Sequence, residues 1–241
     1  MGGLLRAQGK LNEAEPYYRK ALEGRRRVLG DDHPNTLGSI NNMGSVLYFQ
    51  GKLIEAEPYY REALKGYRRV LGEDHRDTLT SINNLGNLLR DQGNLDLAEQ
   101  CYQEFLEAQR RAEPEGGARV GLALVQLGMN LIAQDRHAYA QPILAEGLQI
   151  RQRVMPEGHW LIWNTQSLYG ETLAMQGKFT EAEDLLIEAA EQIQQPEAAQ
   201  IRRDEAIQRV IDLYTAWQAT EPGSGYDTKA DDWRGRLGEL D

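Results

Sequence analysis

The chain has 241 residues, of which 41% are hydrophobic and 27% charged, and its formal net charge at pH 7 is -10. This acidic balance would repel a phosphate backbone, so we expect no nucleic-acid partner. No apolar stretch approaches the roughly 20 residues that a membrane-spanning helix needs, so we expect no membrane partner. Residues 1–10 lack the basic start and apolar core of a secretory signal, and the single cysteine excludes an intramolecular disulfide. We therefore expect a cytoplasmic protein.

A 42-residue repeat organises the sequence. Residues 9–50 align without a gap on residues 51–92, and 29 of the 42 positions are identical. The period continues more weakly, with alanine at Ala14, Ala56, Ala98, Ala140 and Ala182 and glycine at Gly2, Gly44, Gly86, Gly128 and Gly170. A repeat of this kind is typical of arrays in which neighbouring helical units share one core.

Taken in chain order, the predicted elements begin with residues 1–8, which we expect to be only the end of a first helix. Each following repeat is predicted to be a helix, a tight turn and a second helix. Apolar residues recur at helical spacing over 56–64, after the turn at 50–52, and again over 82–89. About five helix pairs of this kind are expected in a single array that spans residues 1–241.

The last unit departs from the period. Ala230 continues the alanine series only if residues 221–226, EPGSGY, are a loop insertion, and their glycine, proline and serine content is typical of a turn. The charged run at residues 227–241 is predicted to be a C-terminal capping helix, because a repeat array needs a polar closing element.

The repeated motifs resemble those of the tetratricopeptide repeat family. They include GKLNEAEPYYRKAL at residues 9–22, DDHPNTL at 31–37 and NNMG at 41–44, each with a close copy 42 residues later. The length and these motifs are similar to the kinesin light chain subclass. The resemblance covers residues 9–111 closely and 116–219 more loosely. It departs where Asp135 replaces a turn glycine, and the long heptad segment of a kinesin light chain is not present.

The resemblance implies an all-α fold, a right-handed α-solenoid of stacked antiparallel helix pairs. It also implies a protein–protein interaction scaffold that holds an extended peptide segment of a partner in a concave groove lined by the first helices. An alternative is the C-terminal regulatory or targeting repeat region of a larger signalling protein, such as a bacterial Ser/Thr kinase, whose catalytic part is not in this chain.

Paired asparagines mark the predicted groove. Asparagine is a poor helix former, yet the sequence SINN occurs at residues 39–42 and again at 81–84, inside predicted helices. An amide can donate to and accept from the main chain of an extended peptide, whatever its side chains are. On the helix face opposite the core we predict peptide-binding residues at Asn41, Ser45, Tyr48, Asn83, Asn87 and Arg90. Asn42 and Asn84, at the edge of the core face, are interpreted as structural residues that bond to a neighbouring turn.

In the third repeat the same helix face is apolar. It carries Leu122, Val125, Met129 and Ile132, and Val125 and Gln126 replace the asparagine pair. An exposed apolar patch usually marks a partner site, so we predict that Leu122, Val125 and Met129 bind a hydrophobic anchor of the peptide. Two alternatives remain open: burial of this helix by its neighbours, and weak self-association of the chain through the patch.

No other group of residues points to chemistry. Three of the four histidines share the repeat frame, which places neighbouring copies about 10 Å or more apart, whereas zinc needs ligands at about 2 Å. We interpret these histidines as turn residues, Cys101 as a core residue, and the paired glutamates of the second helices as solvated surface. We therefore expect no metal, no cofactor and no catalytic site, and predict that the chain is not an enzyme.

Overall fold

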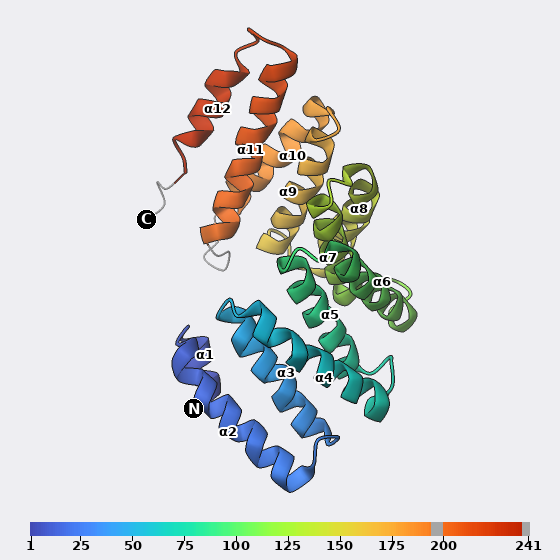
Figure 1. Cartoon of the computed structure of the whole chain (residues 1–241). Coiled ribbons are helices and arrows are strands. Elements are labelled where there is room, and N and C mark those ends of the chain that lie inside the picture. Colours follow the sequence, from blue (N-terminus) through green and yellow to red (C-terminus); the bar gives the residue numbers. More distant parts are fainter. Residues whose placement is uncertain (194–199, 238–241) are drawn as a thin grey trace. The chain divides into compact units, whose positions relative to one another are not determined.

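The computed structural model describes residues 1–193 and 200–237, which form twelve α-helices and, within these ranges, no β-strand (Figure 1). The predicted all-α fold is confirmed. By contacts the chain divides into two compact units, Met1–Ala108 and Gln109–Asp241, here called unit 1 and unit 2. None of the helices in the described ranges is both long enough and apolar enough to cross a lipid bilayer.

Consecutive helices pack side by side within each unit. Unit 1 contains α1 (Gly2–Ala7), α2 (Leu11–Leu29), α3 (Pro34–Phe49), α4 (Leu53–Leu71), α5 (Arg76–Asp91) and most of α6 (Leu95–Ala112). Unit 2 contains α7 (Ala118–Ala133), α8 (His137–Val154), α9 (Trp160–Ala174), α10 (Phe179–Gln192), α11 (Gln200–Thr220) and α12 (Tyr226–Arg234). The odd-numbered helices are the first helices of the repeats, and the even-numbered helices are the second.

Histidines begin three of the first helices. The ring Nδ1 of His33 accepts a hydrogen bond from the backbone N–H of Asn35 at 3.1 Å, so the side chain satisfies one of the free amides at the start of α3. His75 does the same for α5 at 3.1 Å and His159 for α9 at 3.2 Å. The repeated histidines are therefore helix N-caps.

The turn between the two helices of each pair needs a residue with a left-handed backbone conformation, that is, a positive φ. Gly9, Gly51, Gly93 and Gly177 occupy this position with φ between 73° and 80°. Asp135 stands at the same place in the repeat and takes φ 57°, so the turn is kept where the sequence departs from glycine. Aspartate tolerates this region better than most non-glycine residues do.

The glycine series of the first helices lies where the two helices of a pair approach most closely. A Cβ at Gly44 would lie 2.9 Å from the ring of Tyr60, and one at Gly86 would lie 2.9 Å from the ring of Tyr102. In unit 2 the same contacts are Gly128 with Leu144 and Gly170 with Leu186, at 2.5 and 2.8 Å. In each case the partner is sixteen residues further along the chain. A larger residue would force the helices apart.

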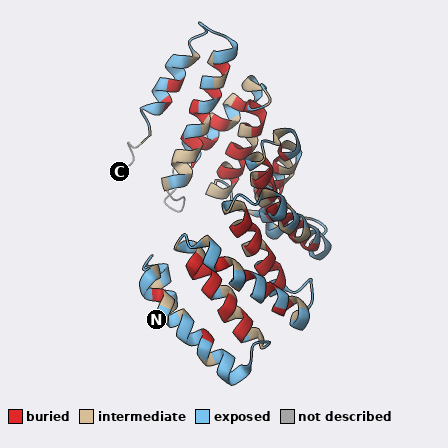
Figure 2. Ribbon diagram, viewed as in Figure 1, coloured by how far each residue is buried: buried red, intermediate tan, exposed pale blue. Residues whose placement is uncertain are grey.

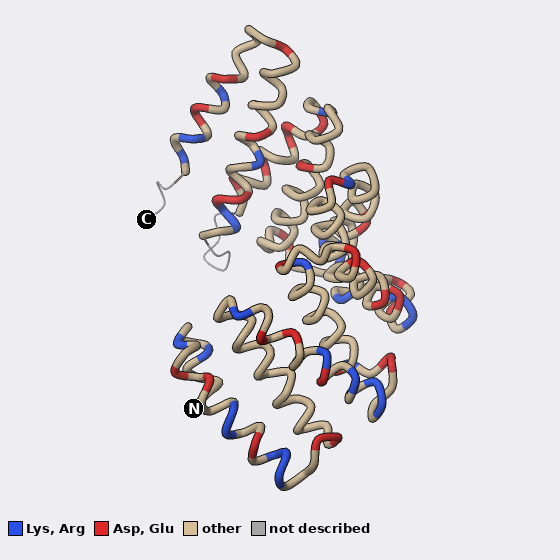
Figure 3. The backbone as a smooth tube through the Cα atoms, viewed as in Figure 1, with Lys and Arg blue, Asp and Glu red and all other residues tan. Residues whose placement is uncertain are grey.

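The core follows these contacts through each unit. Figure 2 shows buried residues concentrated in α3 and α5 of unit 1 and in α7 and α9 of unit 2, while most of α2 is exposed. Arginines at the C-terminal ends of α2 and α4 (Figure 3) complement the helix dipoles and pair with the next second helix. Arg26 lies 2.5 Å from Glu62, and Arg68 lies 2.5 Å from Glu104. Ion pairs as exposed as these add little stability.

The C-terminal elements are a short turn and the last helix, α12. Residues 221–225 form the turn between α11 and α12, and the rings of Trp217 and Tyr226 stack across it with centroids 4.2 Å apart. Ala230 and Trp233 are buried, so α12 closes the core of unit 2. Residues 238–241 of the expected capping helix lie outside the described residues.

Two glycines at equivalent positions of the repeat provide a test of this packing. Gly24 of α2 has no atom within 4 Å of an added Cβ, whereas a Cβ at Gly66 of α4 would lie 2.2 Å from a Leu37 methyl. We predict that Gly24→Ala stabilises the chain by about 0.5 kcal/mol, through reduced backbone entropy of the unfolded state. Gly66→Ala should destabilise it by about 1–3 kcal/mol, because Leu37 is buried and must shift. Urea unfolding of the two variants measures both, and effects of the same sign would contradict this account of the core.

Candidate functional site

The predicted site residues of unit 1 lie on two neighbouring first helices. Asn41, Ser45 and Tyr48 are on α3, and Asn83, Asn87 and Arg90 are on α5. These helices contact each other, so the structure brings the six residues onto adjoining elements. All are partly buried except Ser45, whose exposed fraction is only 8%.

One asparagine of each pair is used to join the two helices. The Asn84 Nδ2 donates a hydrogen bond to the Asn41 Oδ1 at 3.2 Å. Asn84 therefore has a structural role, as interpreted from the sequence, but its partner is an asparagine of α3 and not a turn. Asn42, which was interpreted in the same way, is instead exposed. The Asn83 Oδ1 is a buried oxygen that accepts no hydrogen bond from the described residues.

A second link lies at the C-terminal ends of the same helices. The Tyr48 hydroxyl donates a hydrogen bond to the Asp91 carboxylate, and the Arg90 guanidinium lies 3.3 Å from the other oxygen of that carboxylate. Burial, and then the hydrogen bond to Asp91, raise the pKa of Tyr48 well above its ordinary value. The Tyr48 hydroxyl is therefore a neutral hydrogen-bond donor at physiological pH, and the Asp91 carboxylate holds it in place.

Two of the predicted residues are bound by tyrosines of the core. The Tyr60 hydroxyl donates to the Ser45 Oγ at 3.1 Å, and Ser45 itself donates to the Asn41 backbone oxygen at 3.1 Å. The Tyr102 hydroxyl donates to the Asn87 Oδ1 at 2.8 Å. Ser45 is a correction: its hydroxyl is buried and occupied by these contacts, so it offers little to a ligand.

The most accessible stripe on α3 is one residue further along than predicted. Asn35, Asn42 and Phe49 are exposed at a spacing of seven residues, and Phe49 is 60% exposed although it is a large apolar side chain. Its ring meets that of Tyr48 edge-on, with centroids 5.2 Å apart. The sequence carried the signal in this seven-residue spacing, but the predicted face was centred on Asn41.

The apolar face of α7 in unit 2 is smaller than predicted. Leu122 is exposed, and Met129 and Ile132 are partly buried, but Val125 is only 3% exposed. Val125 is a correction: a Cβ at Gly147 of α8 would lie 3.3 Å from a Val125 methyl, so α8 covers this side chain. Of the three residues predicted to bind the hydrophobic anchor, Leu122 and Met129 therefore remain accessible.

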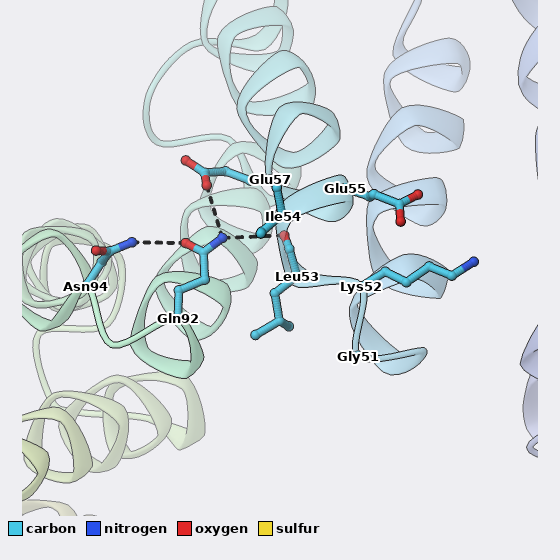
Figure 4. Close-up of a pocket in the computed structure, with 8 residues that line it drawn as sticks. All are labelled: Gly51, Lys52, Leu53, Ile54, Glu55, Glu57, Gln92 and Asn94. Atoms are coloured by element: carbon cyan, nitrogen blue, oxygen red, sulfur yellow. Dashed lines mark hydrogen bonds between the residues drawn. The ribbon is translucent and has the colours of Figure 1, made fainter.

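A cavity of about 630 Å³ lies at the start of α4, beside the turn that follows α5 (Figure 4). The Gln92 Nε2 points into it and donates to the Glu57 carboxylate at 3.0 Å and, weakly, to the Leu53 backbone oxygen at 3.4 Å. Gln50 makes the equivalent bond to Glu15 at 3.2 Å one repeat earlier. These polar groups are already paired with one another. We therefore interpret them as groups that join neighbouring repeats, with the cavity lying beside this contact.

The carboxylates of this contact are held in the charged form. A hydrogen bond from Arg19 is the largest cause that lowers the pKa of Glu15 to about 2, and bonds from Gln50 and Lys52 act in the same direction. Arg61 and then Gln92 lower the pKa of Glu57. The two carboxylates therefore accept hydrogen bonds across neutral pH and are unsuited to proton transfer.

Three sequence profiles described as tetratricopeptide repeat match the chain, at residues 1–35, 37–111 and 83–146. The crystal structure of BtubC (BKLC) from P. vanneervenii is 26% identical in sequence, with a TM-score of 0.71, over 79% of this chain and 76% of that chain. A structure of kinesin light chain nearly identical TPR-like repeats from Podosopora anserina is 16% identical, with a TM-score of 0.70, over 79% and 90%.

A third solved structure is YrrB, described as a TPR protein with an unusual peptide-binding site. It is 16% identical, with a TM-score of 0.51, over 89% of this chain and 97% of that chain. A search of curated proteins found no match to this sequence. The likeness to the two structures at 16% identity concerns the fold, a stack of helix pairs.

The Asn41–Asn84 contact can be measured against an exposed neighbour. Both Asn42→Ala and Asn84→Ala replace a poor helix former with a good one, but only the second breaks a hydrogen bond between α3 and α5. We predict that the Asn84→Ala chain is about 1 kcal/mol less stable than the Asn42→Ala chain. Urea denaturation midpoints of the two variants provide the comparison, and equal midpoints would show that the contact adds no stability.

Proposed function

Because this chain belongs to the tetratricopeptide repeat family, we propose that its first helices bind an extended peptide segment of a partner protein. The chain is of the kinesin light chain-like type, and its α-solenoid fold is that of a protein-interaction scaffold. The peptide segment and the residues that contact it are the proposal. YrrB, whose description includes a peptide-binding site, supports it as a protein with a similar fold.

The observation that carries the proposal is the row of amides on α3 and α5. Asn42 is exposed, Asn41 and Asn83 are partly exposed, and the Asn83 Oδ1 accepts no hydrogen bond from the described residues. An amide side chain can donate to and accept from the main chain of an extended peptide. This arrangement suits a ligand that is recognised by its main chain.

The spacing of the two helices agrees with an extended ligand. Packed helices have axes about 10 Å apart, and an extended chain advances about 3.3 Å per residue. Amides on α3 and α5 would therefore meet main-chain groups about three residues apart. Phe49, exposed beside Tyr48, adds an apolar contact at the end of the same face.

Unit 2 offers a surface of a different kind. Leu122, Met129 and Ile132 of α7 provide an apolar patch where unit 1 has amides. On α9 the equivalent face is closed, because the Arg209 Nε of α11 lies 2.6 Å from the Glu171 carboxylate. We propose that α7 receives an apolar side chain of the partner.

The proposal can be tested with a phage-displayed library of random 12-residue peptides selected on the full chain. Asn42 and Asn83 are replaced together by alanine, which leaves the Asn41–Asn84 contact intact. Loss of two hydrogen bonds of about 1 kcal/mol each should weaken the selected peptides about 30-fold. Lys65→Ala, an exposed change on α4, is the control and should leave affinity unchanged. Equal affinity for the double variant and the control would remove the amide row from the site.

A further inference from the structure

The first turns of α4 and α6, in unit 1, expose large apolar side chains. Ile54, the second residue of α4, is 85% exposed, and Leu97, the third residue of α6, is 45% exposed. The Ile54 position is exposed in every copy of the repeat, but the copies carry polar or small residues there, namely Asn12, Asp96, Ala138 and Thr180. What sets this repeat apart is therefore the apolar character of the exposed residue.

Ile54 does little for the fold. One repeat earlier, the Gln50 Nε2 donates a hydrogen bond to the Asn12 side-chain oxygen at 3.1 Å. Gln92, the copy of Gln50, has Ile54 in place of that acceptor, and finds only the Leu53 backbone oxygen at 3.4 Å. The change from asparagine to isoleucine thus removes a hydrogen bond between repeats and buries almost no apolar surface in exchange.

The cavity of about 630 Å³ at the start of α4 lies directly beside Ile54 (Figure 4). One side of it is formed by residues 51–55 and Glu57, and the other by Gln92 and Asn94 of the turn that leads into α6. Exposed apolar side chains therefore belong to both helices whose starts border the cavity. A protruding apolar side chain beside a cavity offers a partner a surface to cover and a space to fill.

The charges at this place favour a basic partner. Glu55 lines the cavity next to Ile54, is exposed, and forms no ion pair with the part of the chain that the structure describes. Lys52, the cation among the lining residues, already lies 3.2 Å from the Glu15 carboxylate. The net charge of -10 on the whole chain acts in the same direction, because it attracts positively charged partners.

We propose that Ile54, Glu55, Asn94 and Leu97, here called the α4–α6 edge, form a docking site for a segment of a partner protein that carries an apolar side chain next to a lysine or arginine. The apolar side chain would enter the cavity beside Ile54, and the cation would pair with Glu55. A small molecule in the cavity would leave the outer side of Ile54 in water, whereas a protein segment covers it. This site is separate from the amide row on α3 and α5, and either can be correct without the other.

The first test asks whether the scaffold needs Ile54. Ile54→Asn gives α4 the residue that α2 has at this position, so the variant should fold normally. We expect its melting temperature to lie within about 2 °C of that of the unaltered chain or above it, because the new amide can accept from Gln92 as Asn12 accepts from Gln50. A larger fall would show that Ile54 supports the fold, and would overturn the proposal.

The second test uses the probe acetyl-Ala-Leu-Lys-Ala-amide and two matched probes, with alanine in place of leucine or glutamate in place of lysine. NMR of the full chain follows the Asn94 side-chain amide up to about 10 mM probe at about 20 mM salt. We expect the first probe to bind at least about fivefold more tightly than the alanine probe and about threefold more tightly than the glutamate probe. It should bind the Ile54→Asn chain at least about fivefold more weakly. No shift at 10 mM, or equal binding by the three probes or by the two chains, would overturn the proposal.

A charge reversal tests the basic residue of the partner. Glu55→Lys should invert the preference, so that the glutamate probe binds more tightly than the lysine probe. Glu13→Lys is the matched control, since it makes the same change one repeat earlier, where Asn12 replaces Ile54, and it should leave the order unchanged. An unchanged order in the Glu55→Lys chain, or an inversion in both chains, would overturn the assignment to a basic segment.

Sedimentation of the full chain identifies the source of the segment. A monomer at about 50 μM is expected, because the segment is assigned to a different protein. A dimer that Ile54→Asn abolishes would show instead that a second copy covers the α4–α6 edge, and would overturn the assignment to a partner.

Discussion

The close approach of the two helices in each pair is the constraint on which the rest of the structure depends. It is set by the glycines of the first helices, each of which leaves room for a tyrosine or leucine sixteen residues later. At Gly44 and Gly86 the large partner is a tyrosine, whose ring packs against the glycine and whose hydroxyl donates a hydrogen bond to the side chain of the residue that follows the glycine. The same tyrosines therefore fill the core between the two helices of a pair and hold the polar side chains of Ser45 and Asn87.

This coupling explains which side chains remain available to a partner. Side chains that receive a tyrosine hydroxyl or bridge two helices serve the scaffold, as Ser45, Asn87 and the Asn41–Asn84 pair do. Those left over, Asn42 and Phe49 above all, are exposed on a surface that the scaffold holds rigid. A rigid surface loses little conformational entropy on binding, which favours capture of a flexible segment.

Much of the fold followed from the sequence because the repeat supplies its own alignment. Twenty-nine identities in 42 positions fixed the helix pairs, the turn glycines and the close contact at Gly86. The site was harder to predict, because helical periodicity gives the angle of a face only to within about one residue. The predicted face is centred on Asn41, which is partly buried, whereas Asn42, one residue further along, is exposed. Val125 was mistaken for an exposed residue because its burial depends on Gly147, which lies in another helix.

The most direct measurement of the central claim is NMR of the chain with its asparagine side-chain amides labelled, titrated with a peptide segment of a native partner identified by crosslinking. We predict that the amide signals of Asn41, Asn42 and Asn83 shift together and saturate at one ratio, while that of Asn94, in the turn beside the cavity at α4, does not move. Shifts confined to Asn94, or saturation of the partner with all asparagine signals unmoved, would contradict the claim that the amides of α3 and α5 hold a partner's main chain.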